Sequence, residues 1–228
     1  DFNISNLVTT GAVTIDSDVK TINIATTRVN NALGVEQANT LADLDVTTSG
    51  GKTVNISGDG AITISALGNP NTTASFISTN TNAVTLPAIG TGVTFTGGDG
   101  VDTITIGATT KAITTGAGND VVTTGAAFGA GGSLDGGDGT DTLSLSAADV
   151  VTASSDGTYE TGASNFERVA VAQISGNIAV NTANLDDINY ITIAGSAGNS
   201  QVATLNNLAA NPTAVVSAAM GGAAAGVT

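Results

Sequence analysis

The chain has 228 residues, 19 acidic and five basic side chains, a net charge of -14 at pH 7, and no histidine, cysteine or tryptophan. So few Lys and Arg side chains exclude a binding surface for nucleic acid or an anionic membrane, and favour cations as partners. Without histidine or cysteine there is no common general base and no thiol chemistry, so we expect no enzyme.

Residues 1–76 are rich in Gly, Thr, Ser, Asn, Val and Ile, the residues of short strands and tight turns. Apolar residues at i, i+3 and i+5 recur in VKTINI (residues 19–24) and LADLDV (residues 41–46), where the last two alternate as in a strand. KTVNISGDGAITIS predicts two strands around a plain Gly-Asp-Gly turn. We expect residues 1–76 to form an irregular β-solenoid segment.

An apolar residue recurs every nine positions in residues 77–146. The series is Ile77, Leu86, Phe95, Ile104, Ile113 and Val122, and it resumes at Leu134 and Leu143 after a three-residue insertion within residues 126–133. A nine-residue repeat is half a turn of a solenoid, with a loop of about six residues and a short strand whose central residue points inward. The sequence therefore predicts turns of 18 residues around a core of these side chains.

Residues 147–228 return to the irregular pattern. FERVAV (residues 166–171) and INYITI (residues 188–193) repeat the i, i+3, i+5 spacing, and residues 147–152 are compatible with one helical turn. We expect a second irregular β-solenoid segment here.

Three glycine- and aspartate-rich stretches lie in the nine-residue repeat: GGDGVDTIT from Gly97, TGAGNDVVT from Thr115 and GGDGTDTLS from Gly136. Asp102 and Asp120 end the first two loops 18 residues apart, so one turn brings their carboxylates together. At roughly 5 Å and an effective dielectric near 20, their repulsion is about 3 kcal/mol and favours a cation between them. Carboxylate and carbonyl oxygens suit Ca²⁺ better than zinc or copper. The alternative is three ordinary Gly-Asp turns.

These stretches resemble the calcium-binding nonapeptide of the repeats-in-toxin (RTX) family, G-G-x-G-x-D-x-U-x, over residues 97–145, although Thr115 replaces the first glycine of the second copy. The resemblance implies an all-β fold, a right-handed parallel β-solenoid (β-helix or β-roll) whose stacked RTX-type turns bind calcium. The implied ligands of the first site are the carboxylates of Asp102 and Asp120 and the carbonyl groups of Gly97, Asp99, Gly116 and Gly118. A second site would use Asp120 and Asp141, with Gly136 and Asp138 of the third loop. Lys111 takes the aspartate position between the first two copies, so we expect calcium on one edge only.

The whole pattern is similar to bacterial surface-layer (S-layer) proteins, as in DTLSLSAADV, NFERVAV and NLDDINYITIAG. This resemblance implies a secreted structural protein of the cell surface, exported by type I secretion, folded by external calcium and self-assembling into a lattice. An adhesin or ligand-binding module of a large RTX protein, including one that binds ice through threonine arrays, is the alternative. A β-helical polysaccharide enzyme is disfavoured because no base and charge-stabilising group converge. No run of about 18 apolar residues exists, so we expect no membrane insertion.

Overall fold

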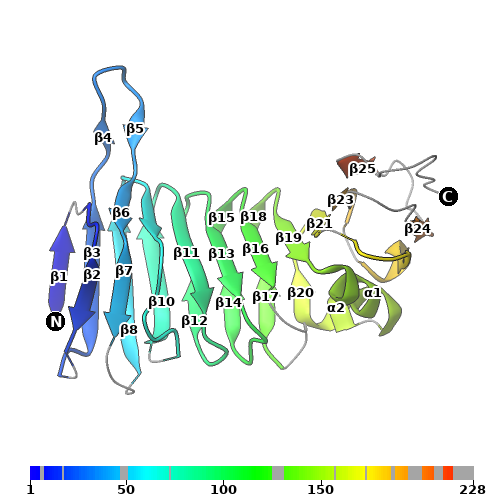
Figure 1. Cartoon of the computed structure of the whole chain (residues 1–228), viewed down its shortest axis with the longest axis horizontal. Helices are drawn as coiled ribbons and strands as arrows, with labels where there is room; N and C mark the ends of the chain where they lie inside the picture. Colours follow the sequence, from blue (N-terminus) through cyan, green and yellow to red (C-terminus); the bar gives the residue numbers. More distant parts are fainter. Residues whose placement is uncertain are drawn as a thin grey trace.

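The computed structural model describes residues 1–5, 8–16, 18–46, 51–71, 73–124, 131–156, 158–172, 174–185, 188–194, 202–207 and 213–217. They form an elongated stack in which successive turns of the chain lie side by side along the longest axis (Figure 1). The strands of each turn pair with those of the turns before and after it. The main sheets contain only parallel pairs in the described part of the chain, as a solenoid requires.

Two long sheets run the length of the stack. The first contains, in spatial order, β1 (Phe2–Ser5), β3 (Thr21–Thr26), β8 (Lys52–Gly58), β10 (Thr73–Asn80), β12 (Thr94–Thr96), β14 (Ala112–Thr114), β17 (Ser133–Asp135) and β20 (Ala163–Ser164). The second contains β6 (Asn39–Leu41), β9 (Ile62–Ile64), β11 (Val84–Ile89), β13 (Thr103–Ile106), β16 (Val121–Thr124), β19 (Thr142–Leu145), β21 (Arg168–Val171), β23 (Tyr190–Ala194) and β25 (Thr213–Ser217). The prediction of an all-β parallel solenoid is confirmed.

Four further two-stranded sheets lie outside the two long sheets of the described residues. They are β2 (Ala12–Ile15) with β7 (Asp43–Val46), β4 (Val29–Asn30) with β5 (Glu36–Gln37), β15 (Ala117–Gly118) with β18 (Asp138–Gly139), and β22 (Ile178–Asn181) with β24 (Ala203–Asn206). The pair β4–β5 is antiparallel and forms a hairpin, whereas the other three pairs are parallel.

Helical structure is more extensive than the single predicted turn. The helices are α1 (Ala147–Asp156), α2 (Thr158–Gly162) and the short 3-10 helix η1 (Thr182–Asn184). The Ser146 hydroxyl accepts a hydrogen bond from the Asp149 backbone N–H (3.1 Å) and donates one to the Asp149 carboxylate (2.7 Å), which caps the start of α1. α1 has ten residues and so extends beyond the one predicted turn. Val150 in α1 and Tyr159 in α2 are fully buried, which shows that both helices pack on the solenoid.

The core consists of inward-facing columns that run along the sheets. Ile104 lies between Leu86 and Val122 in the register of the second sheet, and all three are buried. The nine-residue repeat is thus confirmed at the positions Leu86, Phe95, Ile104, Ile113, Val122, Leu134 and Leu143.

The prediction is wrong for the first residue of the repeat, Ile77. Ile77 is 40% exposed, and its neighbour Phe76 occupies the inward position, in register with Phe95. Two apolar residues stand next to each other here, and strand alternation allows only one of them to face the core. The inward residues Phe76 and Leu86 are 10 positions apart, whereas Leu86 and Phe95 are 9 apart, so the regular repeat begins at Leu86.

The irregular flanks also follow the predicted pattern. In VKTINI, Ile22 and Ile24 are buried, and in FERVAV the three residues of the predicted spacing, Phe166, Val169 and Val171, are buried. KTVNISGDGAITIS forms β8 and β9, which flank the Gly-Asp-Gly turn but belong to different sheets. Among the described residues, no helix has the length and apolar character needed to cross a membrane.

Candidate metal site on the loop edge

The three glycine- and aspartate-rich loops lie on one edge of the solenoid, each between a strand of the first sheet and a strand of the second. The Ala117 N–H donates to the Gly98 carbonyl (2.8 Å), and the Asp138 N–H donates to the Gly116 carbonyl (2.8 Å). Gly118 also pairs with Gly139 in the β15–β18 ladder. The sequence prediction that these loops stack is therefore confirmed, including the third loop, although residues 126–130 of the predicted insertion lie outside the described residues.

Glycine is required at two positions of these loops, because the backbone has a positive φ or because the next turn lies too close for a side chain. Gly116 has φ +99°, and a side chain there would place Cβ 2.2 Å from the Gly98 carbonyl oxygen. A Cβ on Gly97 would lie 1.8 Å from the Thr115 carbonyl oxygen and 2.7 Å from Asp102 Oδ2. Successive turns therefore approach backbone to backbone, and carbonyl and carboxylate oxygens converge beside Gly97.

Thr115, the departure from the nonapeptide, fits this arrangement. Its side chain is fully buried, and its hydroxyl donates a hydrogen bond to the Gly136 carbonyl (2.7 Å). The Thr115 hydroxyl therefore links the second loop to the third by a hydrogen bond that the glycine at the same position of the first and third loops cannot make.

The acidic residues that end successive loops form what we call the carboxylate column, which consists of Asp102, Asp120, Asp141 and Glu167. One carboxylate oxygen of each member accepts a hydrogen bond from a backbone N–H of the preceding turn. Asp102 Oδ1 accepts from Val84 (3.0 Å), and Asp120 Oδ1 accepts from Asp102 (2.7 Å). Asp141 Oδ1 accepts from Asp120 (2.7 Å), and Glu167 Oε2 accepts from Asp141 (2.7 Å). The structure thus brings together the three predicted carboxylates, Asp102, Asp120 and Asp141.

The second carboxylate oxygen of each aspartate in the column lacks a hydrogen-bond partner. Asp102 is 1% exposed, Asp120 and Asp141 are 0% exposed, and Oδ2 of all three is buried and unpartnered. A buried carboxylate without compensation costs several kcal/mol, so such oxygens signal a missing proton or a missing cation. None of the described Lys or Arg side chains forms an ion pair or hydrogen bond with these aspartates.

Burial dominates the electrostatics of the column. The pKa of Asp102 rises to about 8, first through loss of solvation and then through the neighbouring Asp120 carboxylate, and the backbone groups of Val84 and Gly98 oppose this rise. Burial also raises the pKa of Asp120. The pKa of Asp141 rises to about 6, first through burial and then through the charges of Asp120, Glu167 and Asp135. A bound divalent cation would reverse this preference for the neutral form.

Glu167 is the member of the column that the sequence analysis did not identify. It follows Asp141 by 26 residues, because helices α1 and α2 interrupt the regular spacing. The signal was nevertheless present, since an acidic residue stands one position before a strand in DTITI, DVVTT, DTLSL and ERVAV alike. The acid-strand junction is therefore a better marker of this column than the glycine pattern.

The remaining predicted ligands lie in the loops themselves. Asp99 and Asp138 have exposed side chains, and their role as ligands stays a prediction. The Gly116 carbonyl is already engaged by the Asp138 N–H. Lys111 is exposed at the opposite edge, between β13 and β14, where the Thr109 hydroxyl accepts its backbone N–H (3.1 Å). Calcium on one edge only stays a prediction.

The donor set fits a hard divalent cation. Carboxylate and carbonyl oxygens lie on the loop edge, and Ca²⁺ prefers such ligands in flexible geometry. Three buried unpartnered oxygens, Asp102 Oδ2, Asp120 Oδ2 and Asp141 Oδ2, are available to such an ion. Within the described residues, no group of three or more His, Cys, Asp or Glu side chains is arranged so that it could hold a metal ion.

No protein-family model matches the chain, and no curated protein matches its sequence.

Proposed function

We propose that the chain is a structural module in which calcium stabilises the solenoid through the loop edge. The observation that supports this proposal is the carboxylate column, whose three aspartates each hold one buried oxygen without a partner. The carboxylates of Asp102 and Asp120 would hold the first ion, and those of Asp120 and Asp141 the second. Calcium supplies the positive charge that lets these carboxylates ionise in a buried site.

In this proposal the Val84, Asp102 and Asp120 backbone N–H groups orient the carboxylates of the following turn. The loop carbonyls of Gly97, Asp99, Gly118 and Asp138 would serve as neutral ligands, whereas the Gly116 and Gly136 carbonyls already accept hydrogen bonds from the Asp138 N–H and the Thr115 hydroxyl. The module performs no catalytic step. Binding of the ion is coupled to stacking, since the carboxylates come together only when adjacent turns have formed.

We further propose that the parent protein belongs to a secreted bacterial surface layer that self-assembles outside the cell. This proposal rests on the resemblance of the sequence to surface-layer proteins and on the net charge of -14, which disfavours nucleic acid and anionic membranes. Calcium is about millimolar outside cells, within the affinity range of weak extracellular modules. Folding coupled to this calcium would delay assembly until export is complete.

The test is thermal unfolding followed by far-UV circular dichroism while calcium is titrated against a chelator. We expect the melting temperature to rise near millimolar calcium, with magnesium unable to substitute because it demands a smaller octahedral site. Equal stability in calcium and in chelator would overturn the proposal and leave the loops as ordinary Gly-Asp turns. Electron microscopy of the full-length parent protein in calcium separates the lattice from the adhesin alternative.

A further inference from the structure

The solenoid carries a projecting hairpin, which we call the arm and define as residues 27–38, including β4 and β5. The arm leaves the loop edge between β3 and β6 and stands away from the body of the stack (Figure 1). Its strands pair Val29 with Gln37 and Asn30 with Glu36. The proposed calcium loops do not include the arm, so its function is a separate question.

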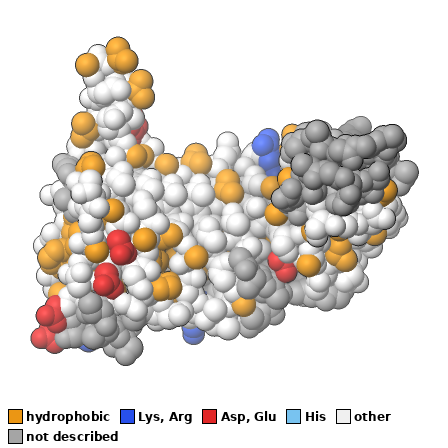
Figure 2. All heavy atoms as spheres, viewed as in Figure 1, with side chains coloured by type: hydrophobic (Ala, Val, Ile, Leu, Met, Phe, Trp, Pro, Cys, Tyr) orange, Lys and Arg blue, Asp and Glu red, His pale blue; other side chains and the backbone are white. Residues whose placement is uncertain are grey.

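The tip of the arm is apolar and exposed. Leu33 is 87% exposed, the highest value among the exposed large hydrophobic residues that the structure describes, and Val35 and Val29 are 57% and 50% exposed. Figure 2 shows hydrophobic side chains at the end of the projection and along its sides. Residues 29–35, VNNALGV, contain no charged side chain, in a protein of net charge -14.

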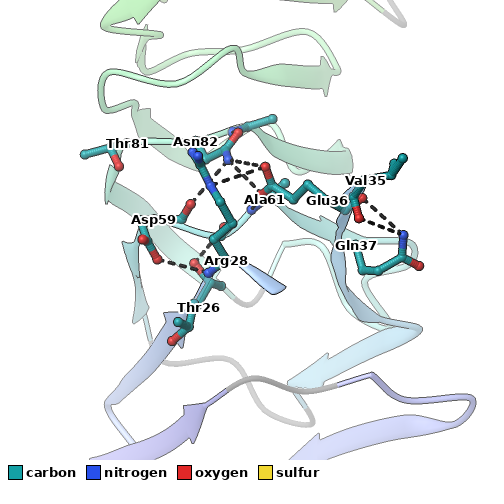
Figure 3. Close-up of polar contacts among 12 residues, drawn as sticks. Thr26, Arg28, Val35, Glu36, Gln37, Asp59, Ala61, Thr81 and Asn82 are labelled. Carbon is teal, nitrogen blue, oxygen red and sulfur yellow. Dashed lines mark hydrogen bonds and ion pairs between the residues drawn. The ribbon is translucent and has the colours of Figure 1, made fainter. Parts of the chain in front are cut away.

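The base of the arm is fastened to the solenoid by a polar cluster (Figure 3). Glu36 accepts hydrogen bonds from the Ala61 N–H (3.0 Å) and from Asn82 Nδ2 (2.8 and 3.0 Å), which belong to the next two turns. Arg28 Nε lies 3.5 Å from Glu36 Oε2, and the Arg28 N–H donates to Asp59 Oδ1 (3.0 Å). The arm therefore has a fixed direction relative to the body.

The tip is also held in one conformation. Asn31 Oδ1 accepts hydrogen bonds from the Leu33 N–H (2.9 Å) and the Val35 N–H (3.0 Å). Gly34, at φ +76°, donates its N–H to the Asn31 carbonyl (2.9 Å). An apolar side chain presented on an ordered turn loses little conformational freedom when it is buried by a partner.

We propose that the arm binds the arm of a second copy of this chain through an isologous contact of the two apolar tips. In the described part of the chain, β4 and β5 pair only with each other, so both outer edges of the hairpin are open to a further strand. A two-stranded hairpin is marginally stable alone in water, and added strands stabilise it. Tip-to-tip packing of Leu33 and Val35 would bury the exposed apolar surface in both copies.

Charge selects the second copy's arm over its body as the docking partner. Two bodies of net charge -14 repel each other, whereas the uncharged tips do not. A strand advances roughly 3.3 Å per residue, so the arm holds the bodies apart by more than a Debye length, which is about 8 Å at physiological salt. Contact through the arms thus leaves the repulsion between the bodies largely screened.

The contact is small. A standard interface buries about 800 Å² on each partner, more than a short hairpin offers, so a single pair of arms dissociates readily in dilute solution. In an array of many copies, each contact after the first forms within the assembly, so the overall avidity exceeds the affinity of a single pair of arms. The inference goes beyond the proposed calcium binding and does not depend on it.

The test uses the absence of cysteine, which lets a single introduced thiol report one location. Asn30→Cys and Ala32→Cys place the thiol on the arm, and Val8→Cys, at a body position that is 72% exposed, is the matched control. Dimers formed with a short bis-maleimide linker are quantified at equal protein concentrations in calcium. We expect the arm variants to cross-link about tenfold faster than the control.

Two further measurements define the contact. Adding Leu33→Asp to Ala32→Cys should reduce cross-linking to the level of the control, whereas salt added above the physiological concentration should change it little, because the bodies are already more than a Debye length apart. Equal rates for the arm and body thiols, or rates insensitive to Leu33→Asp, would overturn the proposal. Stability that is equal in chelator and calcium would remove the calcium proposal while leaving these cross-linking rates interpretable.

Discussion

Replacing Asp102 with Asn tests the reasoning about the carboxylate column most directly, because it removes an ionisable group and keeps a hydrogen-bond acceptor. Asn Oδ1 can still accept the Val84 N–H, which lies 3.0 Å from Asp102 Oδ1. The substitution removes the carboxylate whose pKa burial raises to about 8 from the ordinary value of 3.8. The same change also deletes a proposed calcium ligand, so its effect depends on whether calcium is present.

The magnitude follows from the pKa difference. In chelator at pH 7, Asp102 is largely protonated in the folded protein and ionised in the unfolded chain, and taking up this proton costs about 4 kcal/mol. Asn avoids that cost but buries an amide N–H where Oδ2 has no partner, a penalty of about 1–3 kcal/mol. We therefore expect the variant to be more stable than the wild type in chelator, by roughly 1–3 kcal/mol.

In calcium the advantage should disappear. A ligand at about 100 times its dissociation constant stabilises the folded state by about 2.7 kcal/mol, and the variant loses most of this gain at the first site. The assay is urea unfolding of both proteins in chelator and in millimolar calcium. Asp99→Asn is the control, since the Asp99 side chain is exposed, and its stability should change by less than about 0.5 kcal/mol in either condition.

Two results would refute this reasoning. A variant that is less stable than the wild type in chelator would show that the buried carboxylate is not held in an unfavourable state. A variant that keeps its advantage in calcium would show that Asp102 does not contribute a ligand.

Two further predictions concern the same edge. In chelator, the free energy of unfolding should fall as pH rises from about 4 to 8, because the raised pKa values make the folded state bind more protons than the unfolded chain. Urea midpoints measured across this range test the sign, and a rise in stability over the same interval would contradict it. Gly116→Ala should destabilise by more than about 2 kcal/mol, because it forces φ +99° on alanine and a contact of 2.2 Å with the Gly98 carbonyl. Gly92→Ala, where the added Cβ meets nothing within 4 Å, should stay within about 0.5 kcal/mol, and equal losses at both positions would exclude the close approach as the cause.

The regular half of the fold was predictable because one physical rule governs it. Each turn must place an apolar residue inward at a fixed spacing, so Leu86, Ile104 and Val122 identified both the repeat and the core. The same rule gave the stacking of the loops, since residues one turn apart lie in adjacent rungs. Where Phe76 and Ile77 stand side by side, periodicity gives two possible phases, and only packing against Phe95 decides between them.

The irregular features were not predictable from periodicity. The arm inserts residues without any apolar repeat, and its position depends on contacts of Glu36 with Ala61 and Asn82, which are distant in sequence. The buried Lys52, 1% exposed, donates its ammonium N–H groups to the carbonyls of Asp16 and Val19, and a sequence alone gives a lysine no reason to be inside. Such long-range polar contacts need the fold before they can be recognised.

The candidate site was predictable in its residues but not in its hydrogen bonding. The spacing of Asp102 and Asp120 correctly placed the two side chains in adjacent turns. It did not indicate that each carboxylate accepts a backbone N–H of the turn before it, or that the series continues to Glu167. The first property depends on rotamers and loop geometry, and the second is obscured by the intervening helices.

The hydrogen bonds of the carboxylate column all point the same way along the stack. The acceptor always belongs to the later turn and the donor to the earlier one, from Glu167 back to Val84. If the third loop detaches, the Asp120 N–H loses its acceptor, whereas the Asp141 carboxylate that leaves with the loop regains water. Fraying from the C-terminal side therefore leaves a stack whose last loop presents a backbone N–H donor to water. Fraying from the N-terminal side leaves a stack whose first loop presents a carboxylate acceptor, so the two ends of the column expose opposite hydrogen-bonding groups.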